Sequence, residues 1–106
     1  MTVVETPSFE RSRHGVLADE EVTLLKRFLA LNPWSGPVIP GSGGLRKVRW
    51  AAGGTGKRGG ARVVYLVMTG KERAYLLLAY SKSKQGDLTP AQLKVLRRLA
   101  GEVKAS

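Results

Sequence analysis

The chain has 106 residues, enough for one hydrophobic core, and we expect a single domain over residues 1–106. It has no cysteine and one histidine, His14, which excludes disulfides, thiolate metal sites and two-histidine catalysis. We therefore expect no metal and no cofactor, and we interpret His14 as a solvated loop residue. The net charge of +10 predicts a polyanionic partner, and the lack of a signal-peptide run or membrane-length apolar stretch favours a cytoplasmic protein.

The N-terminal third predicts a short strand and one helix. Residues 2–10 suit an edge strand followed by a loop, and residues 11–15 are polar and expected to be exposed. A helix is predicted over residues 19–32, with Asp19 as its N-cap and apolar residues at helical spacing. It should end there because Pro33 disfavours helical geometry in the residue before it.

Three strands are predicted in the middle of the chain. After a brief extended segment at residues 38–39, strands are expected over 45–52, 61–68 and 73–80, with a glycine-rich hairpin loop over 53–60. Short links between consecutive strands predict an antiparallel meander. The third strand is almost continuously apolar, which is typical of a central strand buried on both faces.

The first of these strands carries two kinds of side chain in alternation. Val48 and Trp50 fall on one face, with Arg46 at its end, and Lys47 and Arg49 fall on the other. The apolar face should pack into the core. Lys47 and Arg49 are therefore predicted to lie side by side on an open surface.

A second helix is predicted near the C-terminus. Thr89 is an N-cap candidate, Pro90 suits the first helical position, and Gln92 completes a capping box. Apolar residues continue at helical spacing to Val103. Together the helices and the meander predict an α+β fold.

Residues 41–62 are the most basic part of the chain. They hold six of its 18 basic residues, and no acid occurs between Glu21 and Glu72. Such a stretch can be a charged rim that only confers solubility. Unpaired like charges, however, destabilise a compact state, so their presence favours the interpretation that this stretch binds a polyanion. The charge alone does not distinguish RNA from DNA or from an acidic protein.

Two nucleotide-binding signatures nearly match this stretch and are rejected. Residues 54–59 fit the pattern G-x-G-x-x-G, but a strand follows them where a dinucleotide-binding fold requires a helix. A phosphate-binding loop of the Walker type would need glycine at Ala51 and serine or threonine at Arg58.

The end of the third strand brings two more polar residues into consideration. In an antiparallel meander, Tyr80 and Lys82 can lie near the start of the second strand, where Arg62 occurs. Lys47, Arg49, Arg62, Tyr80 and Lys82 can then line one concave surface. Tyr80 suits a core position at a strand end equally well.

Four segments of the chain together form a recognisable pattern: Gly41-Ser-Gly-Gly-Leu-Arg-Lys-Val-Arg-Trp50, Gly56-Lys-Arg-Gly-Gly-Ala-Arg62, Leu78-Ala-Tyr-Ser-Lys82 and Asp87-Leu-Thr89. In these segments the chain resembles the HigB-type branch of the RelE/ParE toxin superfamily. The resemblance extends from about Phe9 to Val103. It implies a RelE-like fold, in which an antiparallel meander packs against one or more N-terminal helices and a C-terminal helix.

The resemblance also implies a function. Members of this branch are toxins of type II toxin–antitoxin pairs that cleave messenger RNA in a ribosome-dependent manner. The expected partners are the ribosome, messenger RNA and a cognate antitoxin, which usually carries a helix-turn-helix and binds operator DNA. No membrane partner is expected.

By position, the family's active-site residues match Lys47, Arg49 and Arg62, and less closely Tyr80 and Lys82. Lys47 is then a candidate general base, Arg49 and Arg62 suit stabilisation of a phosphorane, and Lys82 or Tyr80 suits protonation of the leaving oxygen. Other basic residues are predicted to contact RNA or the ribosome: Arg46, Lys57, Arg58 and Lys84. Two alternatives remain open, a ParE-like gyrase inhibitor and an RNA- or DNA-binding module without chemistry.

Overall fold

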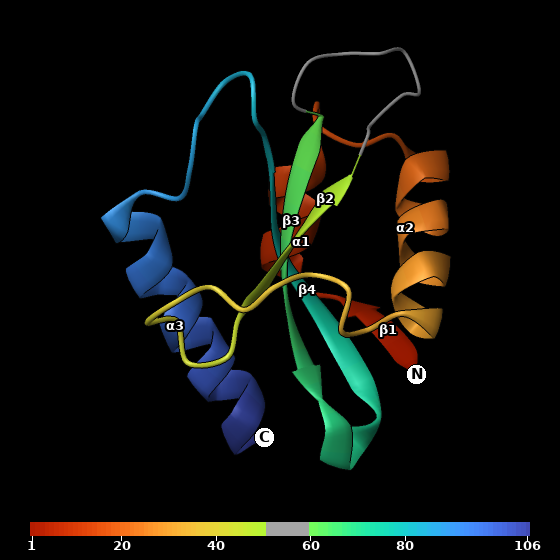
Figure 1. Cartoon of the computed structure of the whole chain (residues 1–106), viewed down its shortest axis with the longest axis vertical. Coiled ribbons are helices and arrows are strands. Elements are labelled where there is room, and N and C mark those ends of the chain that lie inside the picture. The colour runs from red at the N-terminus through yellow and green to blue at the C-terminus, as the bar shows by residue number, and fades with distance from the viewer. Residues whose placement is uncertain (51–59) are drawn as a thin grey trace.

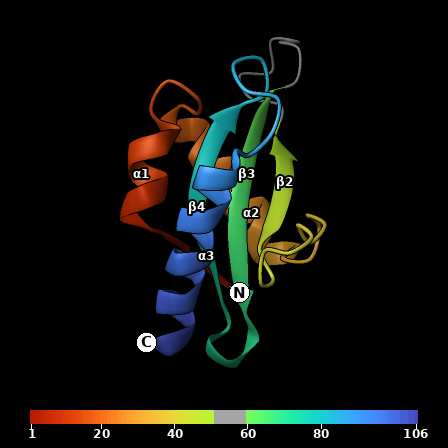
Figure 2. The same cartoon turned by 90° about the vertical axis from the view of Figure 1, so that its left-hand side faces the viewer.

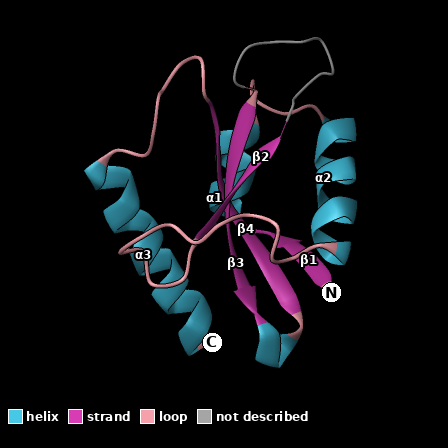
Figure 3. Ribbon diagram, in the orientation of Figure 1, coloured by secondary structure: helices cyan, strands magenta, loops and turns pink. Residues whose placement is uncertain are grey.

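The computed structural model describes residues 1–50 and 60–106 (Figure 1). Within these ranges, four strands and three α-helices occur in the order β1, α1, α2, β2, β3, β4, α3. Their bounds are Thr2–Glu5 for β1, Pro7–Arg13 for α1, Asp19–Leu31 for α2, Arg46–Trp50 for β2, Ala61–Met68 for β3, Arg73–Ser81 for β4 and Pro90–Ala105 for α3, with a 3-10 turn at Thr69–Lys71. Figure 3 shows this α+β architecture, which the sequence predicts.

The strands form one sheet in the order β1-β4-β3-β2. The predicted antiparallel meander of β2, β3 and β4 is confirmed, and so is the central place of β4. β1 is an edge strand, as predicted, and it pairs parallel with β4, so it extends the antiparallel meander into a mixed sheet. A parallel pair requires a long connection, and α1 and α2 begin the connection that leaves β1.

Helices cover both faces of the sheet (Figures 1 and 2). On one face, α1 and α2 pack over a core that includes Phe9, Leu25, Leu29, Val63 and Leu76. On the other face, α3 packs over a second core that includes Leu45, Val64, Leu66, Leu77 and Leu96. Successive residues of β3 alternate between the two cores, so each β3 residue is assigned to the α2 face or the α3 face by its position. In β4 a register shift interrupts this alternation and places both Leu77 and Leu78 on the α3 face.

Residues 7–13 form helix α1 where the sequence predicted a loop. The Thr6 hydroxyl caps this helix by accepting a hydrogen bond from the Phe9 N–H at 3.2 Å, and Pro7 occupies its first turn. Only one large apolar side chain, that of Phe9, is buried in these seven residues, so no helical periodicity is visible. The Thr6-Pro7 start was nevertheless a readable signal, because the C-terminal helix begins in the same way.

The start of α2 also differs from the prediction. Ala18 is the N-cap, not Asp19, and its N–H donates to the Glu21 carboxylate at 2.9 Å. Asp19 instead forms an ion pair at 2.7 Å with Arg13, whose side chain is only 16% exposed. The polar segment 11–15 is therefore partly covered, although it was expected to be exposed.

The C-terminal helix begins as predicted. The Gln92 N–H donates to the Thr89 hydroxyl at 3.1 Å, and the Thr89 N–H donates to the Gln92 side-chain oxygen at 3.0 Å, which together form a capping box. Among the described residues, no helix combines the length and the apolarity that a bilayer crossing requires. The predicted hairpin loop lies outside the described residues, apart from its last residue, Gly60.

Candidate functional site

Three residues on neighbouring strands form a row across the meander. Arg62 on β3 lies opposite Arg49 on β2 and opposite Tyr80 on β4. Lys47 comes two residues before Arg49 and therefore lies on the same face. Its partner in register, Val64, packs in the α3-side core, which identifies this as the α3 face. The register thus brings together four of the five residues predicted for catalysis.

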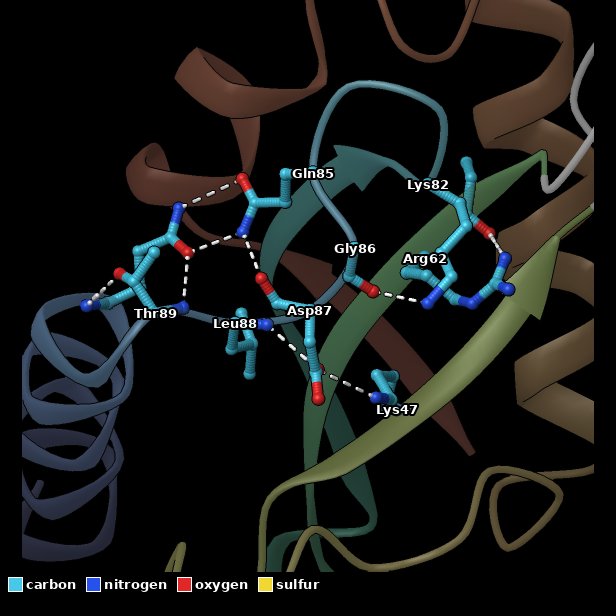
Figure 4. A network of polar contacts seen from close by, with 10 residues as sticks. Lys47, Arg62, Lys82, Gln85, Gly86, Asp87, Leu88 and Thr89 are labelled. Carbon is cyan, nitrogen blue, oxygen red and sulfur yellow. Dashed lines mark hydrogen bonds and ion pairs between the residues drawn. The ribbon is translucent and has the colours of Figure 1, made fainter.

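An acidic side chain that the sequence did not suggest also reaches this face. The Lys47 ammonium forms an ion pair with the Asp87 carboxylate at 3.2 Å, and Figure 4 shows the two groups directed at each other. The same carboxylate oxygen accepts a hydrogen bond from the Leu88 N–H at 2.8 Å. That backbone donor and Lys47 lower the pKa of Asp87, so it is an anion at neutral pH.

Tyr80 belongs to the core and to the site at once. Its side chain is packed in the α3-side core and is 5% exposed. Its hydroxyl oxygen is buried and has no hydrogen-bond partner among the described residues. Burial raises the pKa of the Tyr80 hydroxyl, while the charges of Lys47 and Arg62 lower it and that of Asp87 raises it. The hydroxyl is therefore neutral at physiological pH and close enough to the cations to respond to their charge.

Lys82, the fifth residue of the predicted catalytic set, lies just beyond β4. Its backbone N–H donates to the Gly60 carbonyl at 3.1 Å, which ties it to the start of β3. Its side chain is exposed, and its ammonium donates to the Gly86 carbonyl (Figure 4). Lys84 is exposed in the same loop. Both lysines thus occupy the polar loop between β4 and α3, at the rim of the row.

The other residues predicted to contact RNA are placed differently. Arg46 alternates with Lys47 and lies on the α2 face of β2. Its guanidinium lies 4.8 Å from the centre of the Trp34 ring and donates to the Gly36 carbonyl at 2.7 Å. Arg46 is thus engaged in holding the turn after α2. Lys57 and Arg58 lie outside the described residues.

A shallow groove of about 470 Å³ runs along the edge of β2. Lys47, Arg49 and Arg62 line it together with apolar side chains that include Phe28 and Trp50. The two aromatic rings lie 5.6 Å apart, so the apolar wall is itself well packed. This combination of cations and partly buried aromatic rings suits a phosphate backbone that carries bases.

The turn after α2 closes this groove and is fixed by a buried hydroxyl. Tyr65 donates to the Pro33 carbonyl at 2.8 Å and accepts from the Gly36 N–H at 2.9 Å. A Cβ added at Gly36 would lie 2.8 Å from the Lys47 carbonyl oxygen, so the turn and the β2 backbone are in direct contact. The sequence did not predict this support, because nothing local links Tyr65 to residues 33–36.

Comparison with known families identifies the chain. The family described as the RelE toxin of the RelE / RelB toxin–antitoxin system matches residues 40–106. The matched range is more than half of the chain and includes β2, β3, β4 and α3, with the row of Arg49, Arg62 and Tyr80 and the Lys47–Asp87 pair. A toxin of such a system has a cognate antitoxin as its partner. The chain belongs to the RelE toxin family.

Proposed function

We propose that this toxin inhibits translation by cleaving messenger RNA at the ribosome, as the HigB-type branch that its motifs resemble does. The observation that carries the proposal is the convergence of Lys47, Arg49, Arg62 and the buried Tyr80 hydroxyl on one face of the sheet. The family match supports it, because it covers all four residues. The proposed setting is the cytoplasm, and the proposed antitoxin carries a helix-turn-helix and alone contacts operator DNA.

The proposed reaction uses the nucleophile that RNA itself provides. The 2′-hydroxyl gives up its proton to water and attacks the adjacent phosphorus, negative charge accumulates on the phosphorane oxygens, and the bond to the 5′-oxygen breaks as that oxygen takes up a proton, which leaves a 2′,3′-cyclic phosphate. Arg49 and Arg62 remain charged at any relevant pH and suit the phosphate and the phosphorane. Their opposite placement on β2 and β3 directs both guanidinium groups to one region of the face.

Tyr80 is the proposed proton donor to the leaving 5′-oxygen. The raised pKa of its hydroxyl keeps it protonated at neutral pH, which is the form that can donate. Its hydroxyl has no partner among the described residues, so a substrate oxygen would satisfy a buried polar group. Lys82, the other candidate donor, is exposed and already donates to Gly86, and we assign it to the RNA backbone at the rim.

Lys47 was predicted as a candidate general base. It is the cationic partner of an ion pair with Asp87, and we therefore assign it to phosphate binding and charge stabilisation. Lys47→Arg separates these roles, because arginine keeps the charge and cannot act as a base. We expect Lys47→Arg to retain a large part of the cleavage rate and Lys47→Ala to lose it, measured by single-turnover cleavage. Equal loss in both variants would restore the base assignment.

The proposed function is tested with the purified chain and translating ribosomes. Primer extension on a defined transcript should show cuts inside the coding region that are absent without ribosomes. Arg73→Ala, an exposed change at the opposite end of β4 from Tyr80, serves as a control that should still cleave. Intact transcripts with loss of DNA supercoiling would favour a gyrase inhibitor, and RNA binding without cuts would favour a non-catalytic module.

A further inference from the structure

The loop between β4 and α3 brings an acid into a cationic face. Asp87 is 40 residues from Lys47 in the chain, yet its carboxylate lies 3.2 Å from the Lys47 ammonium. The pair is partly open to solvent, with side-chain exposures of 30% for Lys47 and 73% for Asp87. Exposed ion pairs contribute little to folding stability. Folding stability therefore does not account for this ion pair.

The loop that carries Asp87 is fastened at several points. The Gln85 side-chain amide donates to the Asp87 carbonyl at 2.8 Å and to the Gln92 side chain at 2.6 Å, which connects the loop to the start of α3. The Lys82 ammonium closes the loop from the other end by donating to Gly86 (Figure 4). The Leu88 N–H on its oxygen restrains the Asp87 carboxylate, which is otherwise open to solvent. An anion restrained in this way can orient a flexible lysine.

The chemistry of Asp87 does not suit proton transfer. A general base works best with a pKa near the operating pH, and the Leu88 N–H and Lys47 lower the pKa of Asp87. Asp87 thus remains an anion and is a weak acceptor. Its other available role is to orient the side chain that it touches.

We propose that Asp87 is a positioning residue, which holds the Lys47 ammonium on the α3 face beside Arg62 and Tyr80. The inference rests on the proposed function, because its purpose is to present a preorganised cation to the RNA phosphate. A lysine side chain has four carbons and large rotational freedom, so a fixed partner removes the need to order it during the reaction. Asp87 makes no contact with the substrate in this role.

Asp87→Asn tests the inference with little disturbance to the loop. The asparagine oxygen can still accept from the Leu88 N–H, while the charge that holds Lys47 is removed. Asp19→Asn is the matched control, because Asp19 is an exposed acid in an ion pair with Arg13 at the start of α2, and the change in net charge is the same. We expect the maximal cleavage rate of Asp87→Asn to fall by about 10-fold to 100-fold, with a smaller change in half-saturation, since misplacement of a group by about 1 Å can cost that much in rate.

Further outcomes decide whether the role is positional. Asp87→Glu should recover part of the lost rate, and the melting temperature of Asp87→Asn should match that of Asp19→Asn. Cleavage by Asp87→Asn at the wild-type rate, while Lys47→Ala is slow, would overturn the inference. A large drop in melting temperature would assign Asp87 a structural role and would also overturn it.

A second measurement is independent of cleavage. The Lys47 ammonium should give a resolved ¹⁵N signal by NMR in the isolated protein, assigned by its loss in Lys47→Arg. We expect this signal to broaden or vanish in Asp87→Asn and to persist in Asp19→Asn. Persistence in Asp87→Asn would overturn the inference whatever the protein does at the ribosome. If the Lys47 signal is lost in Asp87→Asn but the wild-type protein cleaves no RNA, the proposed function is overturned and the positioning of Lys47 by Asp87 still holds.

Discussion

Arg62 occupies the middle of the row that crosses β2, β3 and β4, between Arg49 and Tyr80. Its side chain is half-buried, and its guanidinium donates to the carbonyl of the neighbouring Ala61 at 3.4 Å. A charged group held in this way is oriented before substrate arrives. Preorganised donors of this kind lower a barrier more than flexible ones do, because they need not be ordered during the reaction.

We predict that Arg62→Ala removes most of the cleavage activity with little effect on folding. Loss of one charge-stabilising donor costs about 2.7–4 kcal/mol of barrier, or about 10²–10³-fold in rate. The free energy of unfolding should change by about 0.5 kcal/mol, as for most substitutions away from a core. Single-turnover cleavage and urea denaturation measure the two effects, with Arg73→Ala as the control. A variant that cleaves normally, or one that unfolds much earlier, would contradict the assignment.

Tyr80→Phe should separate stability from activity. The Tyr80 hydroxyl is buried without a partner among the described residues, and such a group costs about 1–3 kcal/mol. We therefore expect Tyr80→Phe to be at least as stable as the wild type while its cleavage rate falls. Tyr65→Phe is the matched comparison, because it loses two hydrogen bonds and should be destabilised. Urea denaturation and single-turnover cleavage check both expectations.

The pH dependence of stability gives a control for Tyr80→Phe. Burial raises the pKa of Tyr80 in the folded state, so folding favours the neutral phenol. This contribution is complete below the unfolded value of about 10 and is lost as the pH rises from there through the folded value. The wild type should thus lose more stability than Tyr80→Phe above about pH 10. Parallel curves would mean that the Tyr80 hydroxyl is not desolvated.

At the residue scale, the sequence identified the cations of the site but not their anionic partner. Alternation along β2 was enough to place Lys47 and Arg49 on one face. Asp87 was not predicted to reach them, because the contact depends on the path of the loop between β4 and α3. Local patterns assign a side chain to a face of its own strand, and they do not describe contacts made by a distant loop.

At the scale of elements, β2 is an edge strand whose outer side is covered by the segment after α2. The Lys47 N–H donates to the Pro37 carbonyl at 3.1 Å, and Val38 forms an isolated bridge with Arg46. Tyr65 fixes the preceding turn at Gly36. The backbone that carries Lys47 is thus held from both sides, by β3 and by this segment.

Gly36→Ala should disturb this support. The new Cβ would lie 2.8 Å from the Lys47 carbonyl oxygen and 3.0 Å from the Tyr65 ring, so either the turn or β2 must shift. Such overpacking costs about 1–3 kcal/mol, and we expect cleavage to fall as Lys47 moves. Gly101→Ala is the control, because nothing lies within 4 Å of the Cβ that this change adds. The substitution should stabilise α3 by about 0.5–1 kcal/mol. Urea denaturation measures the stability of both variants, and single-turnover cleavage measures the activity of the folded proteins. A Gly36→Ala variant as stable as the wild type would show that the turn adapts to the added Cβ.

The elements with strong periodic or capping signals were predicted, and so was β1 as an edge strand, but helix α1 was not. The three meander strands and the capped C-terminal helix are confirmed. Helix α1 was missed because seven residues with one buried large apolar side chain give no period, and the start of α2 was misplaced by one residue. The parallel pairing of β1 was missed because four residues carry no information on strand direction; that is decided by the route of α1 and α2.

At the scale of the whole molecule, positive and negative residues are separated along the chain. Five of the eight acids occur in the first 21 residues, in β1, α1 and α2. Some are paired there, as in the Lys26–Glu5 and Arg13–Asp19 ion pairs. Strands β2 and β3 lie within the acid-free stretch between Glu21 and Glu72, so their cations create a positive field on the proposed RNA-binding face.

This separation predicts how RNA binding depends on salt. Each phosphate neutralised on a single strand contributes about −0.7 to the slope of log K against log salt concentration, through release of counterions. We expect weak binding without sequence preference that is lost at moderate salt.

Arg49→Ala should reduce the slope of log K against log salt concentration by about 0.7, because Arg49 is exposed in the groove. Arg73→Ala should leave it unchanged, since Arg73 lies seven positions before Tyr80 on β4, which is about 23 Å of strand. Fluorescence anisotropy with a single-stranded RNA across a salt series measures these slopes. Equal effects of both variants would mean that RNA is held by net charge alone, and the α3 face would then have no special role in binding.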